Sequence, residues 1–167
     1  LPPSVLKRAT EIGIGIAEQF KIEGLIAVEL FLTTSGEVLV NELAPRPHNS
    51  YHESERGCAT SQFEQLVRAV CDQPLGDTAM LRPAAIVNLF GDLWQAHPEP
   101  AFEKALAVPG VRLHLYGKGD PRPARKMGHL SAVGATPMEA LAHARDAAKR
   151  LGVETEMPNL SAAGIVS

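Results

Sequence analysis

The chain has 167 residues, which is enough for one ordinary domain or two small ones. Hydrophobic residues make up 45% of it, and this fraction is typical of a globular protein and excludes a disordered one. The net charge of −3 is too small to recruit nucleic acid or a membrane through a global field, and no apolar run is long enough to span a bilayer.

The chain begins with Leu1 rather than Met, and its first residues lack the basic flank and apolar core of a signal peptide. We therefore expect a fragment or a processed product of a cytoplasmic protein. The first predicted element is a helix from Ser4 to about Phe20, because apolar residues recur at three- and four-residue steps. Gly24 ends this pattern.

Two strand-like runs, residues 25–32 and 37–43, follow and are joined at Ser35-Gly36, a turn signal. A two-residue hairpin loop there places Glu29 directly opposite Glu42, with Cβ atoms roughly 4.5–5.5 Å apart. Two bare carboxylates at this distance repel, so a cation lies between them or one of them is held protonated.

A divalent cation such as Mg²⁺ is the natural candidate, and Asn41 offers a further oxygen ligand. The alternative is a surface hairpin whose two glutamates point into water. Two observations favour the metal site. Glu29 stands inside an otherwise apolar strand, and Asn41-Glu42 comes just before a polar loop rich in proline.

That loop carries a guanidinium, an imidazole, an amide and a hydroxyl within five residues: Arg46, His48, Asn49 and Ser50. Such a set suits a small oxyanion such as phosphate, carboxylate or bicarbonate, since arginine offers a fork of donors. The alternative is a polar connection whose side chains cap local turns. The spacing of His48 and His52 would fit zinc only on a helix, which the neighbouring Pro47 disfavours.

A second helix is predicted to begin near Ser61, where Ser61 and Glu64 form a capping box and four apolar residues from Phe63 to Val70 form one face. Cys71 is expected on the buried side of this helix, with both cysteines as reduced thiols. Residues 72–77 then read as a boundary. Beyond it the patterns predict strands over 84–90, 111–116 and 126–133, a weak helix over 100–106, and a capped helix over 136–151. The second of these strands alternates strictly, with Val111, Leu113 and Leu115 on one face and Arg112, His114 and Tyr116 on the other.

The segment from Lys118 to Lys126 holds four cations in nine positions, stiffened by glycine and proline. It reads as a phosphate-binding loop, and a solvated basic loop is the common alternative. Nucleic-acid binding is disfavoured, because the chain is acidic overall and the segment lacks interleaved aromatic residues.

Two runs carry a family resemblance: residues 24–29 with Val40-Asn41-Glu42-Leu43-Ala44-Pro45-Arg46-Pro47-His48-Asn49-Ser50, and residues 115–118 with 122–130. They closely resemble the ATP-grasp enzymes, and within them the 5-(carboxyamino)imidazole ribonucleotide synthase family, the ATPase subunit of phosphoribosylaminoimidazole carboxylase. The similarity extends from about Gly24 to Leu151. Residues 51 and 53–55 differ from the Gly-His-Trp-Thr run of some members.

The resemblance implies an α+β chain: the C-terminal half of an ATP-grasp domain over 1–75, with an antiparallel sheet and helices, then a small β-rich C-terminal domain with a terminal helix over 76–167. It implies that ATP activates bicarbonate as carboxyphosphate, and that the carboxyl group passes to the amine of 5-aminoimidazole ribonucleotide. Family members are more than twice as long as this chain, so a fragment inactive by itself is expected, whose missing N-terminal half supplies the adenine pocket and lid. A homodimer is also expected.

The implied site residues fall into three groups. Glu29 and Glu42 hold Mg²⁺, with Asn41 and Glu42 at the ATP phosphates. Arg46, His48 and Asn49 bind bicarbonate or carboxyphosphate, and Lys118 and Arg125 bind the ribonucleotide phosphate. The alternatives are another ATP-grasp ligase or transformylase of nucleotide synthesis, in which the loop from Lys118 to Lys126 would differ, and a non-catalytic dimerisation module.

Overall fold

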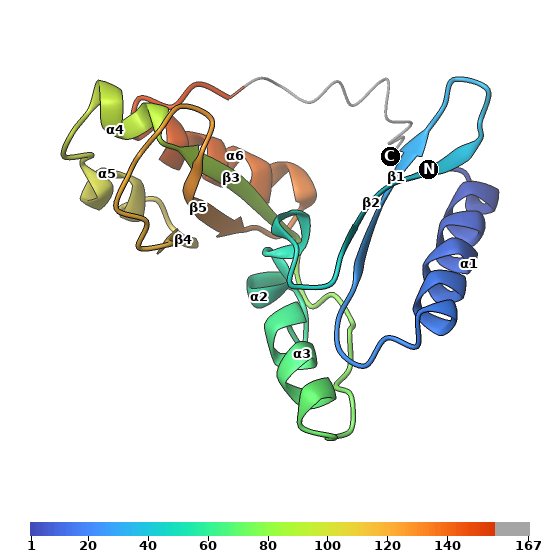
Figure 1. The fold of residues 1–167 in the computed structure, drawn as a ribbon. Coiled ribbons are helices and arrows are strands. Elements are labelled where there is room, and N and C mark those ends of the chain that lie inside the picture. The colour runs from blue at the N-terminus through green and yellow to red at the C-terminus, as the bar shows by residue number, and fades with distance from the viewer. Residues whose placement is uncertain (156–167) are drawn as a thin grey trace. The chain divides into compact units, whose positions relative to one another are not determined.

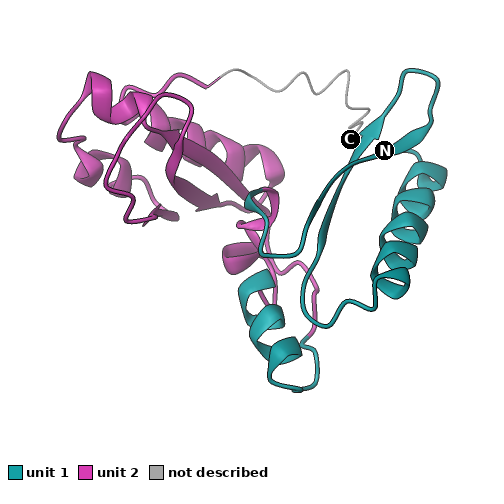
Figure 2. Cartoon of the chain, in the orientation of Figure 1, with its two compact units in different colours: residues 1–49, 62–76, 157–167 teal, residues 50–61, 77–156 magenta. Residues whose placement is uncertain are grey.

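The computed structural model describes residues 1–155, which form two compact units (Figure 2). Unit 1 contains residues 1–49 and 62–76, and unit 2 contains residues 50–61 and the described chain from Asp77 onward. The predicted domains, 1–75 and 76–167, stay a prediction. No helix within the described residues has the length and apolar character that a membrane span requires.

Unit 1 is built from a long helix, a two-stranded hairpin and a short amphipathic helix (Figure 1). They are α1 (Pro3–Gln19), β1 (Ala27–Leu32), β2 (Val38–Ala44) and α3 (Gln62–Val70). The predicted first helix is confirmed, and a proline at its start supplies a φ angle preset for a helix. Its apolar stripe is half-buried, and the helix contacts β2.

The hairpin β1–β2 has the predicted strands and pairs Glu29 with Glu42, as expected. The expected two-residue loop is wrong. Thr33 pairs with Glu37 around a loop of Thr34, Ser35 and Gly36, and Gly36 has a left-handed φ of 87°. The Gly36 N–H donates to the Thr33 carbonyl at 3.0 Å, so a β-turn followed by a left-handed residue closes this three-residue hairpin loop.

The register shifts again at a β-bulge, since Leu30 pairs with Val40 whereas Glu29 pairs with Glu42. Asn41 is the extra residue of this bulge. The longer loop moves the pairing by one residue and the bulge moves it back. The predicted opposition of the two glutamates is therefore correct, although it arises from two irregularities that the prediction did not contain.

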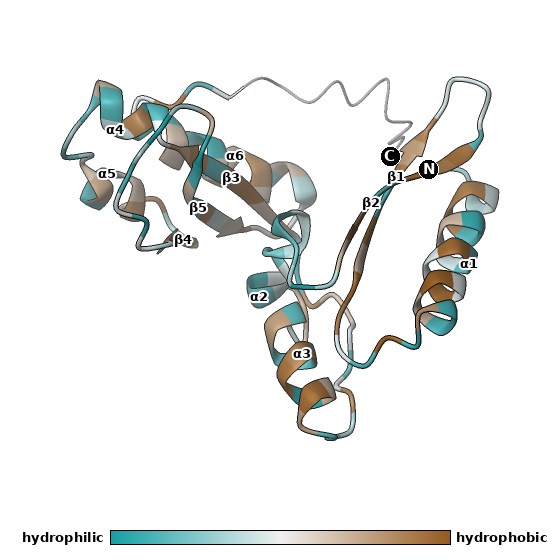
Figure 3. Cartoon of the chain, viewed as in Figure 1, coloured by the Kyte–Doolittle hydropathy of each residue, from teal (hydrophilic) through white to brown (hydrophobic). Residues whose placement is uncertain are grey.

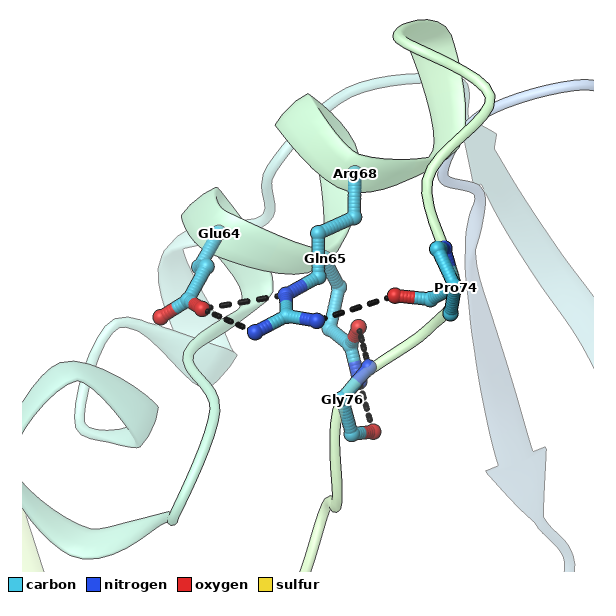
Figure 4. Close-up of polar contacts among 5 residues, drawn as sticks. All are labelled: Glu64, Gln65, Arg68, Pro74 and Gly76. Carbon is cyan, nitrogen blue, oxygen red and sulfur yellow. Dashed lines mark hydrogen bonds and ion pairs between the residues drawn. The ribbon is translucent and has the colours of Figure 1, made fainter.

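Side chains of α3 hold the segment that follows this helix (Figure 4). The Gln65 amide accepts a hydrogen bond from the Gly76 N–H at 2.9 Å and donates one to the Gly76 carbonyl at 2.7 Å. Arg68 donates to the Pro74 carbonyl at 2.9 Å and pairs with Glu64. Cys71 is exposed just beyond the helix end, so its expected burial is wrong.

Unit 2 contains an antiparallel three-stranded sheet in the order β3-β5-β4, with helices around it (Figure 1). Its elements are the 3₁₀ helix η1 (Asn49–Tyr51), whose first residue belongs to unit 1, then α2 (Ser54–Gly57), β3 (Ala84–Phe90), α4 (Asp92–Ala96), α5 (Phe102–Leu106), β4 (Val111–Leu115), β5 (Lys126–Val133) and α6 (Pro137–Arg150). The three predicted strands and the predicted helices near 100–106 and 136–151 are confirmed. The short helices α2 and α4 were not predicted.

The central strand β5 is buried on both faces, because helices cover each side. Leu130 points to the main core, where α6 packs against β5 and β3 and contributes buried alanines. Brown, the apolar colour, predominates along β3 in Figure 3, as suits a strand that packs against this core. α6 begins at Thr136, whose hydroxyl accepts a hydrogen bond from the Glu139 N–H at 3.1 Å, as the capping pattern predicts.

The neighbouring edge strand β4 alternates as predicted. Val111 and Leu113 pack against the core, whereas Arg112 and His114 face Glu55 of α2. Because α2 contacts β5 and β3 as well, it covers the sheet face opposite the main core. This second face carries polar side chains, among them Arg112, His114 and His129, as well as the apolar Ile86, which pairs with Ser131 of β5.

Candidate functional site

Glu29 is the centre of the acidic site in unit 1. One carboxylate oxygen, Oε2, accepts a hydrogen bond from Asn41 Nδ2 at 3.1 Å, and the other lies 3.0 Å from His48 Nε2. The bulge explains the first contact, because an extra residue re-aims a side chain on its strand. Asn41 and His48 thus stabilise the Glu29 carboxylate and offset part of its repulsion by the exposed Glu42 carboxylate. The sequence analysis did not predict these two contacts.

His48 joins this acidic pair to the following loop. Its side chain is only 11% exposed, and both its backbone N–H and its carbonyl are bonded to the Gln62 side-chain amide, at 2.8 and 2.9 Å. Gln62 is the first residue of α3 and is buried. The imidazole is therefore held from two directions, by its own backbone and by Glu29.

Arg46 and Asn49 lie on either side of His48 in the sequence of the loop. Arg46 is exposed, and its guanidinium donates only locally, to the Pro47 carbonyl at 3.2 Å, among the contacts described. Asn49 begins η1 and is half-buried. The exposed guanidinium of Arg46 therefore keeps N–H donors that an incoming anion can use.

The two glutamates suit a magnesium site of a particular kind. Within residues 1–155 no group of three or more His, Cys, Asp and Glu side chains is arranged to hold a metal ion. Mg²⁺ is, however, commonly bound by one or two carboxylates together with substrate phosphates and water. Glu29, with a side chain 40% exposed, and the exposed Glu42 fit that pattern.

The basic loop of unit 2 is ordered by internal contacts. Asp120 forms an ion pair with Arg122 at 3.0 Å. Its carbonyl accepts a hydrogen bond from Arg125 at 2.8 Å, and its carboxylate forms a longer ion pair with Arg125 at 3.8 Å. Lys118 donates from Nζ to the Lys126 carbonyl at 2.7 Å. The two predicted phosphate ligands, Lys118 and Arg125, therefore lie in one loop that begins beside β4 and ends at β5.

A histidine–tyrosine cluster stands next to this loop, on the sheet face that α2 covers. His129 is 3% exposed, and its Nδ1 is 2.8 Å from the Tyr116 hydroxyl. Its ring stacks on that of His114, with centroids 4.6 Å apart, and lies 5.0 Å from the ring of His52. Burial, followed by the nearby His114 and His52, lowers the pKa of His129 to about 4, so it is neutral near pH 7.

Glu55 of α2 lies at the edge of this histidine–tyrosine cluster. Its carboxylate lies 2.9 Å from His114 Nε2 and 3.9 Å from the Arg112 guanidinium. Nearby, burial raises the pKa of the Glu53 carboxyl and lowers that of the Arg56 guanidinium. This polar layer was not predicted, except that the alternation of β4 had placed Arg112, His114 and Tyr116 on one face.

The sequence analysis also missed Gln62, whose side chain is hydrogen-bonded to the backbone of His48. No local sequence pattern indicates that a glutamine after a capping serine will make such bonds. The predicted residues gather in two groups: Glu29, Asn41, Glu42, Arg46, His48 and Asn49 in unit 1, and Lys118 and Arg125 in unit 2. A paired-glutamate hairpin that leads into an Arg-Pro-His-Asn loop is typical of one half of an ATP-grasp site. Comparison with known proteins agrees on this class, since a model of the ATP-grasp domain matches residues 1–63.

A second family model identifies the group within that class. The model of the phosphoribosylaminoimidazole carboxylase C-terminal domain matches residues 84–143, which include the basic loop. The chain is therefore a homologue of the C-terminal part of N5-carboxyaminoimidazole ribonucleotide synthase, as the resemblance implied.

Individual relatives agree. N5-carboxyaminoimidazole ribonucleotide synthase of Bacillus subtilis is 45% identical over 130 residues, covering 76% of this chain and 32% of that protein. Phosphoribosylaminoimidazole carboxylase of Schizosaccharomyces pombe is 37% identical over 145 residues, covering 83% of this chain and 26% of that protein. The chain thus spans about a third or less of the length of these relatives.

Solved structures show the same fold. The Thermotoga maritima synthetase superposes with a TM-score of 0.77 and 43% identity, over 89% of this chain and 42% of that one. The Aspergillus clavatus synthase, solved with ADP and 5-aminoimidazole ribonucleotide, gives a TM-score of 0.77 and 30% identity, over 91% of this chain and 41% of that one.

Proposed function

We propose that this chain is the C-terminal part of an ATP-dependent carbon–nitrogen ligase that carboxylates 5-aminoimidazole ribonucleotide with bicarbonate in purine biosynthesis. In this reaction ATP phosphorylates bicarbonate to carboxyphosphate. The ribonucleotide amine then attacks the carboxyl carbon, phosphate leaves, and the amine loses a proton. ADP and phosphate are the other products.

One observation carries the proposal: the contact between Glu29 and His48, with 3.0 Å between oxygen and nitrogen. It joins the acidic hairpin to the Arg-Pro-His-Asn loop, so the residues suited to the metal and those suited to an oxyanion form one site. Phosphoryl transfer asks a protein mainly for positioning and for neutralisation of charge. A site that joins the two functions provides both.

In this assignment Glu29 and Glu42 hold Mg²⁺, which neutralises charge on the ATP phosphates, and Asn41 and Glu42 lie at the nucleotide. Arg46 offers its free guanidinium donors to bicarbonate or carboxyphosphate. His48 is kept in place by Glu29 and Gln62 and presents its imidazole to the same anion. Asn49 supplies an amide beside it.

The ribonucleotide phosphate is assigned to Lys118 and Arg125. Their loop lies within the residues that match the carboxylase C-terminal domain, and this match favours the carboxylating synthase over another ATP-grasp ligase or transformylase. The solved relative that holds 5-aminoimidazole ribonucleotide supports this substrate. Assembly as a homodimer and a cytoplasmic location stay predictions.

The test uses the whole enzyme that carries these residues. Glu42→Gln is expected to abolish ATP turnover while leaving ribonucleotide binding, measured by calorimetry, unchanged. Glu37→Gln, an exposed glutamate at the turn of the same hairpin, is the matched control and keeps full activity.

Lys118→Ala is expected to raise the KM for the ribonucleotide roughly ten- to hundredfold, since it removes a charged hydrogen bond. Lys104→Ala, on the exposed side of α5, leaves that KM unchanged. If Glu42→Gln and Lys118→Ala both behave like the parent enzyme, the site assignment is wrong.

A further inference from the structure

Lys118 differs from the two arginines of its loop. Arg122 and Arg125 both pair with Asp120, so their charges are partly neutralised before any ligand binds. Within residues 1–155 no carboxylate lies at ion-pair distance from Lys118. Its ammonium group is instead held over the ring of Tyr116, 5.4 Å from the centroid, and donates to the Lys126 carbonyl at 2.7 Å.

Both contacts leave the positive charge of Lys118 intact while they restrict its long side chain. An aromatic face attracts a cation without neutralising it, and a carbonyl accepts only one of three N–H bonds. A side chain that is already ordered loses less entropy when a ligand binds. The side chain of Lys118 is therefore preorganised to bind an anion.

Tyr116 can order Lys118 because its own ring is fixed. Its hydroxyl is bonded to the buried His129 at 2.8 Å, and its ring makes an edge contact with His52, with centroids 6.4 Å apart. His129 is in turn enclosed by His114 and His52. Because this histidine is neutral near pH 7, it adds no positive charge that would repel Lys118.

We propose that Tyr116 is a positioning residue for substrate binding, whose ring, fixed by His129, holds the Lys118 ammonium group where the ribonucleotide phosphate binds. This inference rests on the proposed function, and it assigns to Tyr116 and His129 a role that the family resemblance did not supply. Tyr116 acts through Lys118 and touches no reacting atom.

The experiment is a double-mutant cycle in the whole enzyme, with the steady-state KM for 5-aminoimidazole ribonucleotide as the readout. Tyr116→Leu removes the aromatic face and is expected to raise this KM about two- to fivefold, without changing kcat or the KM for ATP. In the Lys118→Ala background the same substitution has no further effect, because the residue on which Tyr116 acts is gone.

Two further variants separate positioning from folding. Tyr116→Trp keeps an aromatic face and is expected to restore the KM to within about twofold of the parent, which a general packing role would not do. Tyr116→Met replaces Tyr116→Leu if the latter does not fold. Trp94, which packs on the core of unit 2, reports folding by its fluorescence in variants that carry no second tryptophan.

The outcomes distinguish this inference from the proposed function. If Lys118→Ala raises the KM and Tyr116→Leu does not, the positioning role is overturned and the function stands. If the two effects multiply in the double variant, Tyr116 acts independently of Lys118 and the inference is again overturned. If Lys118→Ala itself has no effect, the phosphate assignment fails and the inference fails with it.

Discussion

The buried His129 predicts how the stability of unit 2 depends on pH. Its pKa is lowered to about 4 by burial and by His114 and His52, whereas an unfolded histidine titrates near 6.5. A proton therefore binds the unfolded chain more readily between these values. The stabilisation is fully present above pH ~6.5 and is lost progressively as the pH falls towards ~4.

The magnitude follows from the two pKa values. Between pH 7 and pH 5, His129 becomes protonated in the unfolded chain but stays largely neutral in the folded chain. This difference is expected to lower the free energy of unfolding by about 2 kcal/mol. The groups that face the ring are His114 of β4, His52 before α2, and Tyr116; Glu55 lies beyond His114. A positive charge on either neighbouring histidine opposes protonation of His129 further.

The assay is urea unfolding at pH 7, 6 and 5, followed by the fluorescence of Trp94, the single tryptophan, which packs against the core of unit 2. The matched variant is His129→Gln, whose amide can still bond Tyr116 but does not titrate. It should lose about 2 kcal/mol less than the parent over this range. His97→Gln removes an exposed histidine and should follow the parent. Equal slopes for the parent and His129→Gln would refute the reasoning.

Three further predictions concern local structure. Thr136→Ala removes the cap of α6 and should lower the free energy of unfolding by about 1 kcal/mol in the Trp94 assay, whereas Thr136→Ser should be nearly neutral. Gln65→Ala removes two hydrogen bonds to Gly76 and should speed amide exchange at Gly76 roughly tenfold or more; exchange at the parent rate would show that the segment is held otherwise. Gly36→Ala places a side chain at a φ of 87° and should destabilise the hairpin by about 1 kcal/mol, which hydrogen exchange along β2 would detect.

The hairpin shows how far local rules reach. Apolar strands around a glycine turn were enough to predict β1, β2 and the opposition of Glu29 and Glu42. The loop length was wrong because a left-handed Gly36 serves a longer loop as readily as a two-residue one. The bulge at Asn41 has no local signal, so the contact of Asn41 with Glu29 became visible only in the folded hairpin.

Local patterns were enough to predict the features whose causes are local: the strands of unit 2, the Thr136 cap of α6, and the motifs that place the chain among the ATP-grasp enzymes. Which side chains contact each other is visible only in the folded chain. The contact of His48 with Glu29 requires the chain to turn back after β2, and the contact of Tyr116 with His129 depends on the register of β4 against β5. Contacts between residues far apart in the chain are set by packing, which no short sequence pattern records.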